Sequence, residues 1–137
     1  MKKHLVLITL LLVLALLASC TSGTIDSSNS DKAEYHKINA EEAKARIDSG
    51  DDIVILDVRT LEEYNAEHIK GAILIPNETI SNMQPELLPD LDAEILIYCR
   101  SGNRSAQAAK KLVAIGYIEV YDFGGIIDWP YDTVSGS

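Results

Sequence analysis

The sequence predicts an α/β sandwich built on a mostly parallel sheet. Two short apolar runs, residues 53–56 and 95–98, consist almost entirely of aliphatic, β-branched and aromatic side chains, as buried strands do. The first run shows no alternation of apolar and polar residues, so helices are expected to cover both faces of its strand. Each run is followed by a segment with helical features, and strands that alternate with helices favour this layered architecture.

Length and charge limit the possible classes of protein. The chain has 137 residues, which allows one domain and an appendage, because domains usually hold roughly 100 to 150 residues. The formal net charge is −9. Such an acidic chain is not expected to bind nucleic acid or an anionic membrane surface by electrostatic attraction.

The first 20 residues have the features of a leader segment. Lys2 and Lys3 are followed by an almost unbroken apolar run over 5–17, and small residues precede Cys20. The run is shorter than the roughly 20 residues that span a bilayer comfortably, and small residues suit cleavage. The alternatives are an uncleaved anchor helix and an ordinary secretory leader. Residues 17–20 resemble the lipoprotein signal, which implies a signal peptide over 1–19 and a lipid on Cys20.

This leader predicts where the protein resides. A lipid on Cys20 would hold it in the cell envelope, outside the cytoplasmic membrane, as a periplasmic or cell-surface lipoprotein, and the anchor would be its only membrane contact. Residues 21–31 are rich in Ser, Thr, Asn and Gly, which is typical of a flexible tether. We therefore assign 20–34 to the tether and 35–137 to the folded domain.

Each element of that domain has a local signal. Asn39 followed by Glu42 is a capping-box pattern that begins a helix, and Gly50 ends it. A short helix over 60–64 follows the strand over 53–56. The later elements are a strand over 72–75, a helix from Asn77 to about Leu88 that Pro85 interrupts, the strand over 95–98, a helix that ends at Gly116 and a strand over 118–121.

Cys99 ends the strand over 95–98 and precedes a helix. In that position the thiol meets unpaired N–H groups and the positive end of the helix dipole. Arg100 and Arg104 add positive charge, and Gly102 lets successive N–H groups converge on one point. These features favour the thiolate, which is the reactive form of cysteine. The alternative is an inert core cysteine, which the arginines, the glycine and the helix start disfavour.

The loop and its surroundings resemble the rhodanese family of sulfurtransferases. The stretches that carry the resemblance are the loop over 99–104 and the segments 56–64, 68–76 and 124–129. Glu67 departs from the family pattern, which usually has glycine before His-Ile. The resemblance extends over about 36 to 132 and implies the rhodanese-like three-layer α/β sandwich with a mostly parallel central sheet.

The resemblance also implies a thiosulfate sulfurtransferase-like enzyme that needs no cofactor. Cys99 would take the outer sulfur of a small anionic donor such as thiosulfate, hold it as a persulfide and pass it to a thiol or to cyanide. Arg100 and Arg104 are expected to bind the sulfonate end of the donor. The expected substrate-binding residues are Arg100, Ser101, Gly102, Asn103, Arg104 and Ser105.

Asp57 and Arg59 follow a strand end, where α/β folds gather functional residues. A catalytic role is one interpretation. The resemblance suggests instead a supporting role, which we favour, in which the two charges brace loops beside the site and Arg59 pairs with Glu62 or Glu63.

His68 and Trp129 each have a functional and a structural interpretation, and we favour the structural one for both. His68 is a conceivable general base for Cys99, but a thiolate stabilised by dipoles and arginines needs none. Trp129 is either a lining residue of the substrate entrance or a packing residue, and we favour packing. No metal site is expected, because Cys99 has no second cysteine beside it and the histidines show no ligand spacing.

Two rival functions remain. Cysteine-dependent phosphatases use a similar loop with five residues between Cys and Arg, whereas Cys99 and Arg104 enclose four. The shorter ring suits a single sulfur atom better than a phosphate. A sulfur-relay or binding module with little turnover is the other rival, and the sequence leaves it open.

Overall fold

The computed structural model describes residues 34–136. The predicted signal peptide, Cys20 and the tether up to residue 33 lie outside the described residues, so lipid attachment stays a prediction.

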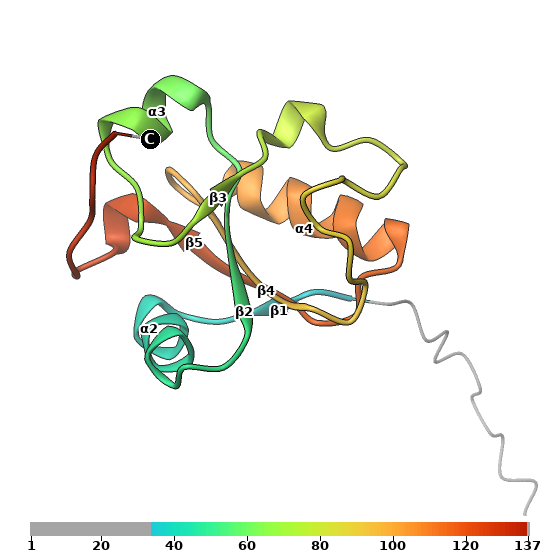
Figure 1. Ribbon diagram of the computed structural model, residues 1–137, viewed down its shortest axis with the longest axis horizontal. Coiled ribbons are helices and arrows are strands. Elements are labelled where there is room, and N and C mark those ends of the chain that lie inside the picture. The colour runs from blue at the N-terminus through green and yellow to red at the C-terminus, as the bar shows by residue number, and fades with distance from the viewer. Residues whose placement is uncertain (1–33, 137) are drawn as a thin grey trace, which may run out of the picture. The chain divides into compact units, whose positions relative to one another are not determined.

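A parallel sheet forms the centre of the described domain (Figure 1). Within residues 34–136 the sheet has five strands in the order β1-β5-β4-β2-β3, and all four pairings are parallel. The strands are β1 (His36–Lys37), β2 (Ile53–Asp57), β3 (Ile73–Leu74), β4 (Glu94–Cys99) and β5 (Val120–Gly125). The predicted α/β class with a parallel sheet is confirmed.

Helices cover both faces of the sheet, which makes three layers. Figure 1 shows α4 (Asn103–Ile115) on one side of the strands and α2 (Ala40–Asp48) on the other. Side chains of β4 alternate between the two faces. Ile95, Ile97 and Cys99 belong to the core under α4, whereas Leu96 and Tyr98 belong to the core that includes Ala43 of α2.

Two capping boxes begin the short helices. The Asn39 side chain accepts from Glu42 N at 2.8 Å, and the Glu42 carboxylate accepts from Asn39 N at 2.9 Å. The predicted helix start at Asn39 is therefore confirmed. Thr60 and Glu63 form the same arrangement at the start of α3 (Leu61–Ala66).

The predicted helix from Asn77 to Leu88 is wrong. Only the 3-10 helix η1 (Asn77–Thr79) forms, and the chain up to β4 is irregular. The Asn77 side chain does not cap η1 but donates to Gln107 at 3.2 Å. Pro85 lacks an N–H group and restricts the residue before it, so it opposes a helix through this stretch.

Two strand boundaries also differ from the prediction. The strand expected over 72–75 is limited to β3, Ile73–Leu74. The strand expected over 118–121 runs instead from Val120 to Gly125 and is followed by the 3-10 helix η2 (Ile126–Asp128). Its two glycines extend the pairing with β4 as far as Cys99, although glycine has a low strand propensity.

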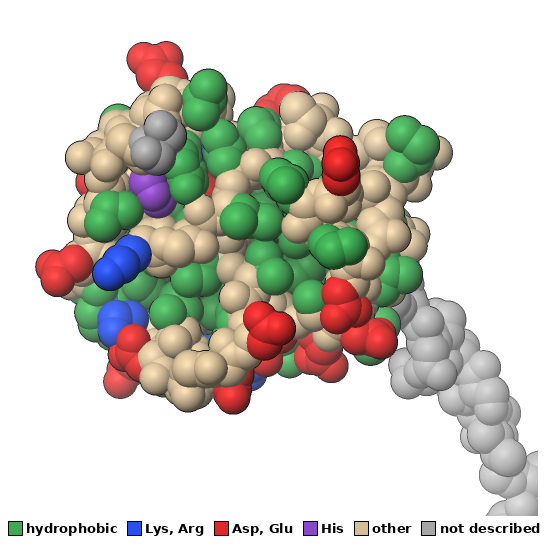
Figure 2. All heavy atoms as spheres, viewed as in Figure 1, with side chains coloured by type: hydrophobic (Ala, Val, Ile, Leu, Met, Phe, Trp, Pro, Cys, Tyr) green, Lys and Arg blue, Asp and Glu red, His purple; other side chains and the backbone are tan. Residues whose placement is uncertain are grey.

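The surface view agrees with the acidic composition. Figure 2 shows Asp and Glu side chains distributed around the margin of one face, while hydrophobic side chains occupy much of its centre. Across residues 34–136, the helices are all too short or too polar to cross a bilayer.

Candidate active site

Three strands bring the candidate residues to one edge of the sheet. Asp57 at the end of β2 pairs with Tyr98, and Cys99 at the end of β4 pairs with Gly125. Because the strands are parallel, their carboxyl ends share this edge, where α/β folds place ligand sites. The predicted nucleophile therefore lies beside both flanking strand ends.

Cys99 lies at the base of the loop that joins β4 to α4, and only 1% of the residue is exposed. Gly102 N donates to Cys99 Sγ at 3.0 Å, and Sγ lies 3.6 Å from Ser105 Oγ. Gly102 has φ +98°, a left-handed conformation that side chains disfavour. This conformation turns the loop back so that its amide meets the sulfur.

Most N–H groups of the loop remain available to a ligand. In the described chain no hydrogen-bond acceptor is found for the amides of Arg100, Ser101, Asn103, Arg104 and Ser105. The last three belong to the first turn of α4, whose amides have no partner within the helix. The positive end of the helix dipole lies there too. The loop thus has the donors that an anion requires.

The end of β5 forms a wall of the loop. A Cβ on Gly125 would lie 2.2 Å from the carbonyl oxygen of Arg100, which is too close for any side chain. Gly125 has φ −122°, so space, not backbone conformation, requires glycine here. The single proton of Ser105 Oγ has two carbonyl acceptors within reach, Gly102 O at 3.1 Å and Gly124 O at 3.3 Å. The glycine pair is visible in the sequence, but no sequence pattern indicates that it packs against the cysteine loop.

Arg104 is held by α3. Its Nη1 and Nη2 donate to the two carboxylate oxygens of Glu63 at 2.7 and 2.8 Å. The hydrogen bond from Arg104 lowers the pKa of Glu63 to about 2, and Glu63 in turn raises the pKa of Arg104. Arg104 was predicted to bind the donor, but here its guanidinium is already engaged.

Asp57 and Arg59 form a buried ion pair at the end of β2. Arg59 Nη2 donates to Asp57 at 2.6 Å and to the carbonyl oxygen of Glu67 at 2.6 Å. Burial opposes the charge of Arg59, but the hydrogen bonds that Arg59 donates to the Asp57 carboxylate, together with the charge of Asp57, outweigh burial and raise the pKa of Arg59. The predicted pairing of Arg59 with Glu62 or Glu63 is wrong, because Asp57 lies close enough for Arg59 to fold back on it.

Arg100 is the arginine of residues 34–136 that has no ion pair, since Arg46, Arg59 and Arg104 each contact a carboxylate. It is exposed and borders a depression of about 390 Å³ beside the loop. The other lining residues are Arg59, Glu63, Ala66, Glu67, Ile126 and Ile127.

His68 and Trp129 have packing contacts. The His68 ring stacks on Tyr64 with centroids 3.8 Å apart, and its Nδ1 lies 2.9 Å from the Tyr64 carbonyl oxygen. The hydrogen-bond partners of Cys99 do not include His68. Trp129 is 8% exposed and packs between Phe123 and Tyr131.

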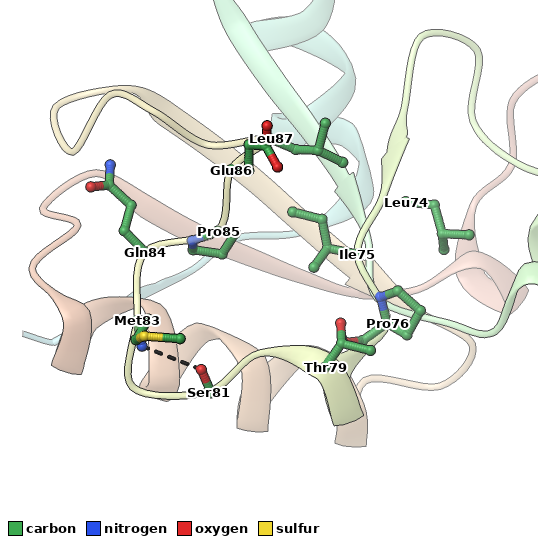
Figure 3. A pocket seen from close by; sticks show the side chains of 10 residues that line it. All are labelled: Leu74, Ile75, Pro76, Thr79, Ser81, Met83, Gln84, Pro85, Glu86 and Leu87. Atoms are coloured by element: carbon green, nitrogen blue, oxygen red, sulfur yellow. Dashed lines mark hydrogen bonds between the residues drawn. The ribbon is translucent and has the colours of Figure 1, made fainter.

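A second depression lies at the β3 edge, and its lining includes no residue of the cysteine loop (Figure 3). Its lining is mostly apolar, and Figure 3 shows one hydrogen bond in it, from Met83 N to Ser81 Oγ at 3.3 Å. It contains no cysteine, histidine or basic side chain. Residues 34–136 also contain no cluster of His, Cys, Asp and Glu that would hold a metal ion. The cysteine loop is therefore the candidate site.

A parallel sheet with a strand that ends in a cysteine, followed by a loop with unpaired amides and the start of a helix, is typical of a rhodanese-type domain. The pattern described as "Rhodanese-like domain" matches residues 39–130. The chain belongs to this family.

Its curated relatives include sulfurtransferases. Thiosulfate sulfurtransferase PspE of Escherichia coli is 36% identical over 81 residues, which cover 59% of this chain and 78% of PspE. Thiosulfate sulfurtransferase GlpE of Pseudomonas fluorescens is 34% identical over 77% of this chain and 97% of GlpE. The putative sulfur carrier protein YrkF of Bacillus subtilis is 34% identical, and the match spans 56% of its length.

Solved structures agree with the family assignment. A rhodanese-like domain protein from Staphylococcus aureus has a TM-score of 0.64 and 31% identity, with 74% of this chain and 99% of that chain covered. A structure described as a rhodanese with anions from E. coli has a TM-score of 0.54 and 34% identity, with 61% and 98% covered.

Proposed function

We propose that the protein is a sulfurtransferase that carries sulfane sulfur as a persulfide on Cys99, with thiosulfate as a donor. The observation that carries this proposal is the position of Cys99 Sγ, 3.0 Å from the Gly102 amide and inside a loop with free N–H groups. Relatives named thiosulfate sulfurtransferases support the choice of donor.

In the first step, the Cys99 thiolate attacks the outer sulfur of thiosulfate. A bond forms between Sγ and that sulfur, the S–S bond of thiosulfate breaks, and sulfite leaves with the electron pair. Cys99 becomes a persulfide anion, and no external oxidant or reductant takes part. The loop amides and the start of α4 stabilise the negative charge of the persulfide, as an oxyanion hole does.

In the second step, a thiolate or cyanide attacks the outer sulfur of the persulfide. The new bond takes the sulfur to the acceptor, and Cys99 leaves as the thiolate. With cyanide the product is thiocyanate. Ser105 Oγ lies 3.6 Å from Sγ and accepts from the thiol form of Cys99.

The free amides and the exposed Arg100 suit an anionic donor. Charge-assisted hydrogen bonds from a guanidinium are stronger than neutral ones, and Arg100 has no competing carboxylate. The related E. coli rhodanese described with anions supports anion binding in this family fold.

The test is mass spectrometry of the protein after treatment with thiosulfate. We expect one added sulfur on the peptide that contains Cys99, and its loss when cyanide is added. The Cys99→Ser variant is the control and should gain no sulfur. A wild-type Cys99 peptide without added sulfur would contradict the proposal.

A sulfur-relay role is the second candidate, because one relative is named a putative sulfur carrier protein. Turnover separates the two. A sulfurtransferase forms many equivalents of thiocyanate from thiosulfate and cyanide, whereas a relay module releases about one equivalent per Cys99. The phosphatase alternative predicts hydrolysis of an aryl phosphate, and the four-residue spacing between Cys99 and Arg104 argues against it.

We also propose that lipidated Cys20 holds the domain in the cell envelope. The leader motif over 17–20 supports this proposal. Expression of the full chain in a bacterium, followed by membrane fractionation, tests it. The Cys20→Ser variant should leave the membrane fraction and keep its sulfur-transfer activity. Retention of that variant in the membrane would contradict the lipid anchor.

A further inference from the structure

We propose that Glu63 sets the donor selectivity of the site by neutralising Arg104, so that donors with one negative charge are favoured over dianions. This inference rests on the sulfurtransferase function proposed above. It concerns a residue of α3 that lies outside the cysteine loop and its predicted ligands.

The contacts of Glu63 hold its carboxylate in place. Both oxygens accept from Arg104, and Oε2 also accepts from Thr60 N at 3.0 Å and Thr60 Oγ1 at 3.1 Å. The carboxylate thus closes the capping box of α3 and binds the loop arginine at once. A donor that displaces it from Arg104 must also disturb the start of α3.

The pair changes the charge that a donor meets. The loop contributes two guanidinium groups, but the charge of Arg104 is balanced at contact distance by Glu63. The hydrogen bond from Arg104 lowers the pKa of Glu63 to about 2, so the carboxylate is ionised at neutral pH. Arg100 is then the guanidinium of the loop whose charge is not balanced.

Two sulfane donors separate the effect of charge from that of chemistry. Thiosulfate is a dianion, and benzenethiosulfonate is a monoanion with the same kind of outer sulfur. One balanced and one free guanidinium match the charge of a monoanion, whereas the second charge of thiosulfate is repelled by the nearby carboxylate. Because the Coulomb energy depends on the product of the charges, Glu63 penalises thiosulfate more.

The experiment compares kcat/KM for thiosulfate with kcat/KM for benzenethiosulfonate, and we call the quotient the donor ratio. Glu63→Gln removes the carboxylate charge and keeps an oxygen for the cap. We expect the donor ratio to rise about 3- to 10-fold, through a lower KM for thiosulfate and with less change in kcat. High salt should reduce this rise.

Two further variants act as controls. Glu62→Gln removes the same charge from an exposed neighbour that makes no ion pair, and its donor ratio should stay within about twofold of wild type. The double variant Glu63→Gln/Arg104→Gln replaces the pair by two neutral amides. Since the pair carries no net charge, the donor ratio of the double variant should also stay within about twofold, whatever the absolute rate.

The outcomes distinguish the two proposals. An unchanged or lower donor ratio in Glu63→Gln would overturn the role of Glu63, and so would a large fall of the ratio in the double variant, which would show that Arg104 binds the donor directly. If Glu63→Gln does not fold, the donor ratio of the double variant remains as the test of the role of Glu63. If neither donor adds sulfur to Cys99 of the wild type, the sulfurtransferase proposal fails and this inference fails with it.

Discussion

The carboxyl ends of β2 and β4 are neighbours in the sheet, yet they use charge in opposite ways. At the end of β2, the Asp57 carboxylate accepts from the backbone N–H, Nε and Nη2 of Arg59, so the two charges satisfy each other in the interior. At the end of β4, Cys99 Sγ accepts a hydrogen bond from one amide, and several other N–H groups of the loop have no acceptor.

The difference follows from the backbone that leaves each strand. After β2, a long side chain folds back two residues onto a carboxylate. After β4, a left-handed glycine turns the main chain around a sulfur atom. The first arrangement pairs a cation and an anion within the fold, whereas the second keeps several N–H donors without an acceptor beside the sulfur.

The sharpest test of this contrast is Cys99→Ser. Because the hydroxyl is a far weaker nucleophile than a thiolate, we expect sulfur transfer to fall by about 10³-fold or more. Circular dichroism and the unfolding transition should stay close to wild type. Thiocyanate formation checks the activity, and near-normal turnover in this variant would refute the role of Cys99.

At the end of β2 we expect an effect on stability. Asp57→Asn leaves the 3% exposed Arg59 without its counter-charge, and loss of one partner from a buried pair typically costs about 3–5 kcal/mol. Urea unfolding at neutral pH measures this loss.

Asp48→Asn is the matched control, since Asp48 pairs with Lys44 at the exposed surface. It should cost no more than about 0.5 kcal/mol. Similar costs for both variants would mean that the Asp57–Arg59 pair contributes no more than a surface pair.

Gly125→Ala tests the wall of the open loop. The added methyl group must displace the Arg100 carbonyl, which we expect to cost about 1–3 kcal/mol and to lower the rate of sulfur transfer. Gly50→Ala is the control, because no atom lies within 4 Å of its added Cβ while φ is +78°. That variant should lose about 1 kcal/mol of stability and keep its activity. Full activity of Gly125→Ala would show that the loop adapts.

The Glu63–Arg104 pair predicts a pH dependence. In the folded protein the pKa of the Glu63 carboxyl is about 2, below its ordinary value of 4.5. The pair therefore stabilises the fold fully above about pH 4.5, and this contribution is lost as the pH falls toward 2. We expect about 1–2 kcal/mol after solvent screening. Urea unfolding at pH 6 and pH 2.5 measures it. Glu63→Gln should lose less stability than wild type over that interval, and equal losses would argue against the pair.

The smallest effect is expected for Arg100→Ala. Loss of the free guanidinium should raise KM for thiosulfate about fivefold, which corresponds to about 1 kcal/mol. Lys110→Ala removes an equal charge from an exposed position of α4 and serves as control. Equal changes in KM for both variants would assign the effect to net charge rather than to contact.

Much of the fold was predictable because its signals are local. The apolar run of β2 and the strand, loop and helix around Cys99 identified the centre of the sheet and the candidate nucleophile. The capping box of Asn39 also gave a correct helix start. In each case the residues that determine the element lie within a few positions of one another.

Two of the errors concern side chains whose partners are distant in the sequence. The Asn77 side chain contacts Gln107 of α4 and does not cap a helix. Arg104 lies 41 positions from Glu63 in the sequence, and the prediction had instead paired Arg59 with Glu62 or Glu63. One local signal was available, because Thr60 and Glu63 have capping-box spacing, which places the Glu63 carboxylate at the start of α3.

The position of β5 has a consequence for synthesis of the chain. This strand emerges after the nucleophile but inserts between β1 and β4, and its glycines close the loop around the sulfur. Until β5 has been made, the nascent Cys99 lacks that shield and is open to oxidation. A ribosome stalled before residue 120 would therefore present a thiol that alkylating reagents modify faster than the thiol of the completed domain.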